Sequence, residues 1–250
     1  MIRSLQRMLE FRLLADDGRI GHVDDFYFDD VSWTIRYLVA DTGFWLTGRK
    51  VLVAPESLGE SDADRELVAV SLTREQIASA PGLDAEAIVS RQNEMDLAKH
   101  YGWAPYWAGG MLDAELGRSI AAEAMQGEKQ YVESLTGSAL RSTREVARYD
   151  VRAADGKLGD VEDFLADTDH WAIRYLVIDT GSWLPGKNVL VAPEWIRKVS
   201  WADRSIELDV GLERARTAPE YDADTPLTRE MEQRLHEHFG RPGYWEAGGR

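Results

Sequence analysis

The sequence repeats itself, and the repeat constrains the fold more than any other feature. The segment from Trp33 to Glu56 returns as Trp171 to Glu194, with 18 of the 24 positions identical. Each residue of the second copy lies 138 positions after its counterpart. A long repeat at a fixed spacing indicates two copies of one domain in tandem. We therefore predict a first domain over residues 1–110, a connector over 111–137 and a second domain over 138–250.

Composition limits the class of protein. The chain of 250 residues is 44% hydrophobic, enough for two small cores, and its net charge of −15 repels phosphate backbones. It has no cysteine, which excludes disulfides and thiolate chemistry. No stretch approaches the roughly 18 apolar residues of a membrane span, and no secretory leader is recognisable. We expect a soluble, acidic, cytoplasmic protein that does not bind nucleic acid and has no membrane span.

Both copies show a pattern of short strands. The run that begins at Ile20 mixes apolar and acidic residues and predicts a strand with a bulge. The next run, from Trp33 to Val39, alternates large apolar residues with others, as a strand does. The apolar run Val51–Ala54 and a run near Leu67–Leu72 complete the set. Short strands joined by tight turns predict a mainly β fold, with a small antiparallel barrel or sandwich in each copy.

One helix is expected after each set of strands. Ser90 and Thr228 are candidate N-caps, and Gly102 and Gly240 are placed where helices end. Both copies then continue into a Tyr-Trp pair, which we expect to close the floor of the barrel. The pairs are Tyr106-Trp107 and Tyr244-Trp245.

Several motifs occur in the same order in both copies and resemble the PRC-barrel family. They are DG-x-[IL]-G-x-V-x-DF, followed by W-x-IRYLV-x-DTG-x-WL-x-G-x-x-VLV-x-PE, and the resemblance covers residues 3–80 and 141–218. It implies two tandem PRC-type barrels. In this family the barrel also forms the cytoplasmic part of the photosynthetic reaction-centre H subunit and the C-terminal domain of a ribosome maturation factor. The resemblance implies a docking or assembly domain of a bacterial protein, and it carries no catalytic residues.

The two Asp-Thr-Gly triplets admit two interpretations. Two such triplets in two similar lobes also resemble the aspartic proteases, in which paired aspartates share a proton and activate water. The alternative is structural: Asp41 and Asp179 accept backbone hydrogen bonds at a turn, while Gly43 and Gly181 supply a positive φ. The chain is short for a two-lobed protease, and no flap is recognisable, so we favour the structural turn.

Other acidic and histidine motifs are weak candidates for metal sites. No window matches a calcium-binding loop, and pairs such as Asp24-Asp25 and Asp29-Asp30 are expected to be solvated turns. His236 and His238 form an H-x-H, whose side chains diverge on a helix. No nucleotide-binding or nucleophile motif occurs. We predict no metal site, no cofactor and no catalytic residues.

The loop after each triplet carries large apolar residues. They are Trp45, Leu46, Trp183 and Leu184. Such residues either plug the end of a barrel or anchor a partner, and we favour the plug. We predict a non-catalytic protein-binding or assembly module, with an aspartic endopeptidase as the alternative. Its protein partner is not identified by the sequence, and both a homo-oligomer and an intrachain pseudo-dimer are compatible with the repeat.

Overall fold

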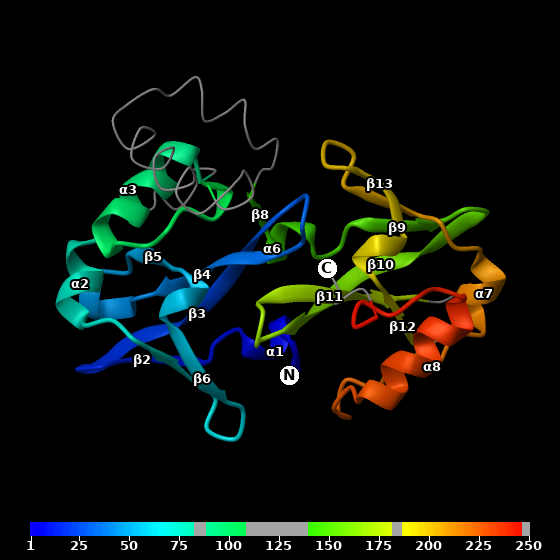
Figure 1. Ribbon diagram of the computed structural model, residues 1–250, viewed down its shortest axis with the longest axis horizontal. Helices are drawn as coiled ribbons and strands as arrows, with labels where there is room; N and C mark the ends of the chain where they lie inside the picture. The colour runs from blue at the N-terminus through cyan, green and yellow to red at the C-terminus, as the bar shows by residue number, and fades with distance from the viewer. Residues whose placement is uncertain (83–88, 109–139, 182–186, 247–250) are drawn as a thin grey trace. The chain divides into compact units, whose positions relative to one another are not determined.

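The computed structural model describes residues 1–82, 89–108, 140–181 and 187–246 (Figure 1). These residues form two compact units. The repeat 1 unit comprises Leu9–Arg141, and the repeat 2 unit comprises Met1–Met8 together with Ser142–Arg250. The predicted connector, 111–137, and both predicted domain boundaries lie outside the described residues. Each unit is built around a seven-stranded sheet, which confirms the expectation of a mainly β protein with two domains.

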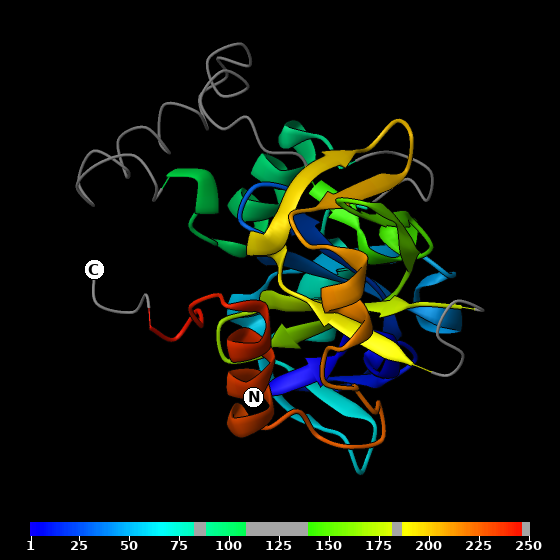
Figure 2. The ribbon, with the colours of Figure 1, turned by 90° about the vertical axis from the view of Figure 1, so that its right-hand side faces the viewer.

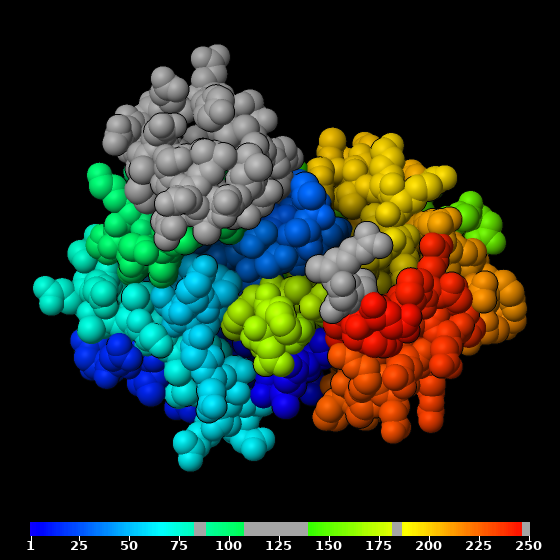
Figure 3. All heavy atoms as spheres, viewed as in Figure 1, coloured from blue at the N-terminus to red at the C-terminus, as the bar shows by residue number. Residues whose placement is uncertain are grey.

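The sheet of the repeat 1 unit has the strand order β5-β4-β3-β2-β7-β6, with β8 added beside β3. Its strands are β2 (Arg12–Ala15), β3 (Gly18–Asp29), β4 (Ile35–Asp41), β5 (Lys50–Val53), β6 (Leu58–Asp62), β7 (Leu67–Val70) and β8 (Leu140–Ser142). The register of β3 against β4 shifts between Val23 and Asp25 and again between Tyr27 and Phe28. The predicted bulge is therefore confirmed. Figure 3 shows the turn between β6 and β7, in cyan, projecting from the surface of this unit.

The sheet is mixed, so the prediction of a purely antiparallel arrangement is wrong. Strand β7 pairs with β2 in parallel. The reason lies at Ala54–Ser57, where the short 3-10 turn η2 (Pro55–Ser57) bends the chain between β5 and β6. Because Pro55 has no N–H group to donate to a ladder, it ends β5 there. Among the described residues the two edge strands, β5 and β6, do not pair with each other. A closed barrel is therefore not confirmed.

Strand β4, which lies between β5 and β3, is buried on both faces. Residues directly opposite each other in a sheet share a face, and Leu38 lies opposite both Phe26 and Val53. All three side chains are fully buried. The other face carries Tyr37 and Val39, which pack in a cluster with residues of the helix α3 (Arg91–Tyr101) and its approach. The helix therefore covers one face of the sheet.

The repeat 2 unit has the corresponding sheet, in the order β12-β11-β10-β9-β14-β13, with β1 beside β10. Its strands are β1 (Ile2–Ser4), β9 (Asp150–Ala153), β10 (Gly156–Asp167), β11 (Ala172–Asp179), β12 (Asn188–Val191), β13 (Ile196–Ser200) and β14 (Ser205–Leu208). Strands β14 and β9 form its parallel pair, and η4 (Pro193–Trp195) makes the bend between β12 and β13. The helix α8 (Arg229–Phe239) takes the position in this repeat that α3 has in the other.

Each sheet includes a first strand that comes from the other repeat. In the repeat 2 unit, Ile2 pairs with Asp167 and Ser4 pairs with Leu165. The helix α1 (Leu5–Met8) follows, with Leu5 and Met8 fully buried. Strand β8 of the second repeat pairs in turn with β3 of the first. The two repeats thus exchange their first strands.

Side chains on both sides of the exchange support these added strands. In the repeat 2 unit, Ser4 Oγ donates to Asp163 Oδ2 at 2.5 Å, and the Gln6 N–H donates to Asp163 Oδ1 at 2.9 Å. In the repeat 1 unit, the Arg141 guanidinium lies 3.1 Å from Asp30 Oδ2, and Leu140 packs against the core cluster. These contacts attach each exchanged strand through both backbone and side chains.

The helices begin and end as their caps predict. Ser90 accepts a hydrogen bond from the N–H of Asn93, and Thr228 accepts one from the N–H of Met231. Gly102 and Gly240 adopt the left-handed conformation at the C-termini, with φ of 73° and 65°. The described residues also form the short helices α2 (Arg74–Ser79), α6 (Thr143–Val146) and α7 (Leu212–Arg216). In the described part of the chain, no helix is long and apolar enough to cross a membrane.

Candidate functional site

The Asp-Thr-Gly turn at the end of β4 is held by its own backbone. Asp41 Oδ1 accepts a hydrogen bond from the Gly43 N–H at 2.8 Å, and Thr42 Oγ1 donates to the Arg49 carbonyl at 2.7 Å. Gly43 has a φ of 54°, a conformation that glycine adopts without strain. The geometry is that of an Asx turn, and the aspartate carboxylate is engaged within it.

The second triplet has the same geometry. Asp179 Oδ1 accepts from the Gly181 N–H at 2.8 Å, and Thr180 Oγ1 donates to the Lys187 carbonyl at 2.8 Å. Gly181 has a φ of 58°. Asp41 and Asp179 belong to different units, and each takes part in the turn of its own unit.

A glycine in the preceding strand is required for the turn to form. Gly21 lies where β3 crosses the end of β4, and a Cβ atom there would be 1.9 Å from the carbonyl oxygen of Asp41. Gly159 is in the same position, with its Cβ 2.0 Å from the carbonyl oxygen of Asp179. Both obstacles are backbone atoms, which no side-chain rotation can move. The glycine of the DG-x-[IL]-G motif therefore allows the two strands to approach.

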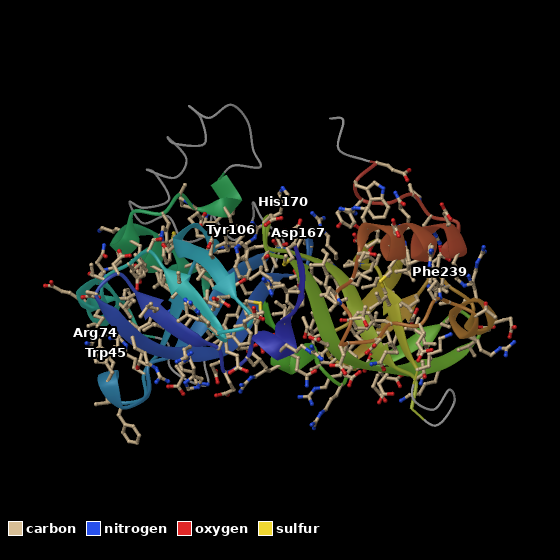
Figure 4. The ribbon with its side chains drawn as sticks, turned by 90° about the horizontal axis from the view of Figure 1, so that it is seen from below. Trp45, Arg74, Tyr106, Asp167, His170 and Phe239 are labelled. Atoms are coloured by element: carbon tan, nitrogen blue, oxygen red, sulfur yellow. The ribbon has the colours of Figure 1, made fainter. Side chains whose placement is uncertain are left out.

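The apolar turn that follows the first triplet is η1 (Gly43–Leu46), and its three large residues differ in exposure. Phe44 is fully exposed, whereas Trp45 and Leu46 are half-buried. The Arg74 guanidinium lies over the Trp45 ring, 4.6 Å from its centroid, and Figure 4 shows the two side chains together. Trp183 and Leu184 lie outside the described residues. Trp45 is thus braced from one side by a cation, while its neighbour projects into solvent.

Three of the paired aspartates are buried, so their prediction as solvated turns is wrong. The exposed fractions of Asp24, Asp25 and Asp29 are 8%, 6% and 3%. Asp24 pairs with the Lys50 ammonium at 2.6 Å, and Asp29 accepts from the Arg36 guanidinium at 2.7 Å. Hydrogen-bonded partners offset the cost of removing these carboxylates from water. They fix the bulged strand β3 and the turn that follows it.

A buried carboxylate cluster joins α3 to the sheet of the repeat 1 unit. Glu94 is 2% exposed and lies 2.6 Å from the Arg91 guanidinium. The Tyr106 hydroxyl donates to Glu94 Oε1 at 2.8 Å. Burial raises the pKa of Glu94 to about 7, against the opposing effects of Arg91 and of hydrogen bonds from Tyr106 and Tyr37. The charge of this carboxylate therefore changes near neutral pH.

The repeat 2 unit has the corresponding cluster around Glu232, which is also 2% exposed. Arg229 lies 3.0 Å from Glu232 Oε2, and the hydroxyl oxygens of Tyr175 and Tyr244 each lie 3.0 Å from Glu232 Oε1. Burial raises the pKa of Tyr244 to about 12, so that its hydroxyl keeps its hydrogen. His236 also belongs to this cluster. The residue at the corresponding position of repeat 1 is Ala98.

The Tyr-Trp pairs pack beside these clusters. Arg36 lies over the Tyr106 ring at 4.1 Å, and Arg91 lies over the Trp107 ring at 4.2 Å. Their counterparts in the second repeat are Arg174 over Tyr244 at 4.1 Å and Arg229 over Trp245 at 4.2 Å. In Figures 1 and 2 the red segment turns sharply away from the end of α8. The pairs fasten the helix through arginines of the first helical turn and of the sheet.

The two histidines of the H-x-H diverge as expected. His236 is buried, with Nδ1 2.9 Å from the Pro242 carbonyl oxygen, whereas His238 Nε2 lies 2.8 Å from the Arg214 carbonyl oxygen. Each ring is thus used within the unit. Among the described residues, no group of three or more histidine and acidic side chains is placed to hold a metal ion.

Sequence reasoning missed the buried clusters around Glu94 and Glu232. A signal was present, because an Arg-x-x-Glu pair opens the helix in both copies and a tyrosine recurs at 37 and 175. Arginine and glutamate three residues apart lie on one helical face. Their burial depends on contacts between the helix and a strand distant in sequence, which the local pattern does not contain.

A comparison with protein-family models finds no match for this chain, and a comparison with curated proteins finds none either.

Proposed function

We propose that this chain is a tandem PRC-barrel protein that works as a non-catalytic binding or assembly module for another protein. The resemblance of its two motif sets to that family supports the proposal. So does the path of each sheet, because its two edge strands are consecutive in the chain. In the repeat 1 unit only Ala54–Ser57 separates β5 from β6, which brings one edge of the sheet round toward the other. We propose that this curled sheet is the PRC-type barrel.

The observation that carries the proposed function is the exposed Phe44 on a fixed turn. Hydrogen bonds of Asp41 and Thr42 hold the backbone on both sides of the turn, and Arg74 braces Trp45 next to it. An aromatic side chain held in solvent by a rigid turn is pre-organised for burial against a partner, because little conformational entropy is lost on binding. Aromatic residues are also the most frequent anchors of protein interfaces.

The second repeat offers a natural replacement for this residue. Ser182 stands at the position that corresponds to Phe44. We expect the substitution Phe44→Ser to leave the melting temperature unchanged, because the side chain is fully exposed. It should abolish association with the partner, or self-association if the partner is a second copy.

The test compares three full-length proteins in binding assays with the native cell extract and in sedimentation experiments. Wild type and Phe44→Ser are compared with Val31→Ser, a matched control at another exposed apolar residue. The proposal requires an identified protein, or a dimer, that is retained by wild type and Val31→Ser and lost with Phe44→Ser. If no association depends on Phe44, the turn is not the binding surface and the proposal fails.

A further inference from the structure

The cluster around Glu232 contains a histidine, His236, that the cluster around Glu94 does not have. This histidine changes the hydrogen bonding of the cluster. In the repeat 2 unit the Tyr175 hydroxyl lies 3.0 Å from Glu232 Oε1 and 3.0 Å from His236 Nε2. The other ring nitrogen, Nδ1, lies 2.9 Å from the Pro242 carbonyl oxygen. Tyr175, Glu232 and His236 are all at most 3% exposed. In repeat 1, Ala98 stands at the position of the histidine, so this position offers Tyr37 no imidazole.

The hydrogens of this chain can be counted. A carbonyl oxygen only accepts, so Nδ1 of His236 carries a hydrogen toward Pro242. In a neutral imidazole Nε2 is then an acceptor and takes the hydrogen of the Tyr175 hydroxyl. That hydroxyl has no second hydrogen for Glu232, and an ionised carboxylate has none to offer. Burial raises the pKa of Tyr175, so its hydroxyl stays protonated. The contact between the Tyr175 oxygen and Glu232 Oε1 therefore lacks a hydrogen.

Uptake of a single proton completes the chain in either of two ways. With the proton on the carboxyl, Glu232 donates to the Tyr175 oxygen and the Tyr175 hydroxyl donates to Nε2. With the proton on the imidazole, Nε2 donates to the Tyr175 oxygen and the hydroxyl donates to Glu232. The two forms differ only by movement of the hydrogens along the chain, and both have the same net charge.

The charged groups around His236 oppose one another. Burial lowers the pKa of His236 below its usual value, and the bond to Pro242 and the carboxylates of Glu194, Glu232 and Glu246 oppose this only in part. These groups come from η4, from α8 and from the segment that follows α8. Strand β11 contributes Tyr175 and Arg174, and α8 also contributes Arg229, whose guanidinium pairs with Glu232. The rings of Trp195 and Trp245 pack edge-to-face with the imidazole, with ring centroids 5.2 Å and 5.0 Å from it.

We propose that Glu232, Tyr175 and His236 form a buried proton-binding site whose histidine the first repeat lacks, and that the bound proton secures the segment after α8 to its unit. The link to that segment is direct, because His236 donates to Pro242 and Glu232 accepts from Tyr244. Losing the proton removes one hydrogen bond from a site that is buried from solvent. A buried polar group without a partner is costly, so the segment is held less firmly.

The proposal fixes the sign of a pH effect. In the unfolded chain the histidine releases its proton at a pH of about 6.5 and the glutamate at about 4.3. If the folded site keeps one proton to a higher pH, its contribution to stability is complete below about 6.5 and is lost as the pH rises through the pKa of the folded site. A buried neutral histidine beside an ionised glutamate gives the opposite trend, with stability lost as the pH falls below about 6.5.

The experiment measures unfolding of the full chain by denaturant over a range of pH from about 5 to 9, on both sides of the reference value of about 6.5 for histidine. Wild type is compared with His236→Ala, which reproduces the residue of the first repeat, and with Glu232→Gln. The amide of Glu232→Gln can donate to the Tyr175 oxygen and so supplies the missing hydrogen without a proton. Above pH about 6.5 we expect the wild-type folding equilibrium constant to fall, relative to both variants, by up to about tenfold per pH unit.

Two results would overturn the proposal. One is a stability difference between wild type and the variants that does not depend on pH. The other is a wild type that loses stability relative to the variants as the pH is lowered, which means that the site excludes the proton. Glu232→Gln keeps the shape of the cluster, so it gives an answer even if His236→Ala is too unstable to measure. Glu94 titrates equally in all three proteins and cancels in the comparison.

Discussion

Single polar groups hold the two Asp-Thr-Gly turns, and the proposed binding surface depends on them. Asp41 and Asp179 each accept the N–H of the glycine two residues later. These bonds end the strand and set the direction of the turn that carries Phe44. A carboxylate used in this way acts on its own backbone and requires no partner from the other repeat.

Substitution of either aspartate by alanine should therefore lower stability without affecting any reaction. We expect a loss of about 0.5–2 kcal/mol for Asp41→Ala or Asp179→Ala, the range typical of a side chain that caps a backbone N–H. Asp41→Asn keeps an accepting oxygen and should lose less. Denaturant unfolding measures both effects. Pepstatin-sensitive proteolysis at acid pH that either alanine substitution abolishes would instead establish the aspartic endopeptidase.

The carboxyl group of Glu94 gives a second prediction for a single residue. Burial raises its pKa to about 7, so the folded state binds a proton that the unfolded chain releases at a lower pH. Stability should fall as the pH rises from about 4.5 to about 7, by at most about 1.4 kcal/mol per pH unit. Glu94→Gln should remove this fall. Asp96→Asn, at an exposed carboxylate of the same helix, should leave it in place, and loss of the fall in both variants would contradict the assignment.

At the level of secondary structure, the strands β3 and β4 approach each other so closely that the position between them requires Gly21. A methyl group at this position meets the carbonyl of Asp41, so either β3 or β4 must move. We expect Gly21→Ala to cost at least about 2 kcal/mol in unfolding free energy. Gly43→Ala is the matched control, because its Cβ meets nothing within 4 Å and only its positive φ is unfavourable, at about 1 kcal/mol. Equal losses in the two variants would show that the approach of the strands is not limiting.

The sequence predicts elements well where the determining contacts are local. Ser90 and Gly102 mark the ends of α3 because capping depends on neighbouring backbone groups. The run from Ile35 to Asp41 forms a strand, as its β-branched and aromatic residues predict. Trp33 was expected within that strand, but its φ of 55° places it in the preceding turn. The sequence does not predict the parallel pair of β2 and β7. Whether these strands pair parallel or antiparallel depends on whether the chain only bends at Pro55 or reverses its direction there.

The exchange of first strands is the main structural feature of the molecule as a whole. It could not be predicted from the local sequence. Ile2-Arg3-Ser4 and Leu140-Arg141-Ser142 have the same pattern, and so do the strands β3 and β10 that receive them. Either first strand therefore matches either receiving strand. The choice between them is made by the path of the chain and not by side-chain chemistry, so a pattern of residues cannot predict it.

Cleavage of the connector tests the exchange. A specific protease site inserted between residues 120 and 121 should give two fragments that stay together in native buffer, since each supplies a strand to the other. Size-exclusion chromatography of the cleaved protein measures this. Leu5→Asp places a charge in the core of the repeat 2 unit, where Leu5 is 1% exposed, and should promote separation. Fragments that separate without denaturant would show that each repeat keeps its own first strand.

Synthesis of the chain from its N-terminus gives the exchanged strand a further consequence. Ile2 pairs with Asp167, so the strand β1 cannot reach its place until the ribosome has passed Asp167. At the usual rate of translation this delay is on the order of ten seconds. During that time Leu5 and Met8, which end fully buried, remain uncovered. The first repeat likewise waits for β8, so neither unit is complete before the ribosome has passed into the second copy.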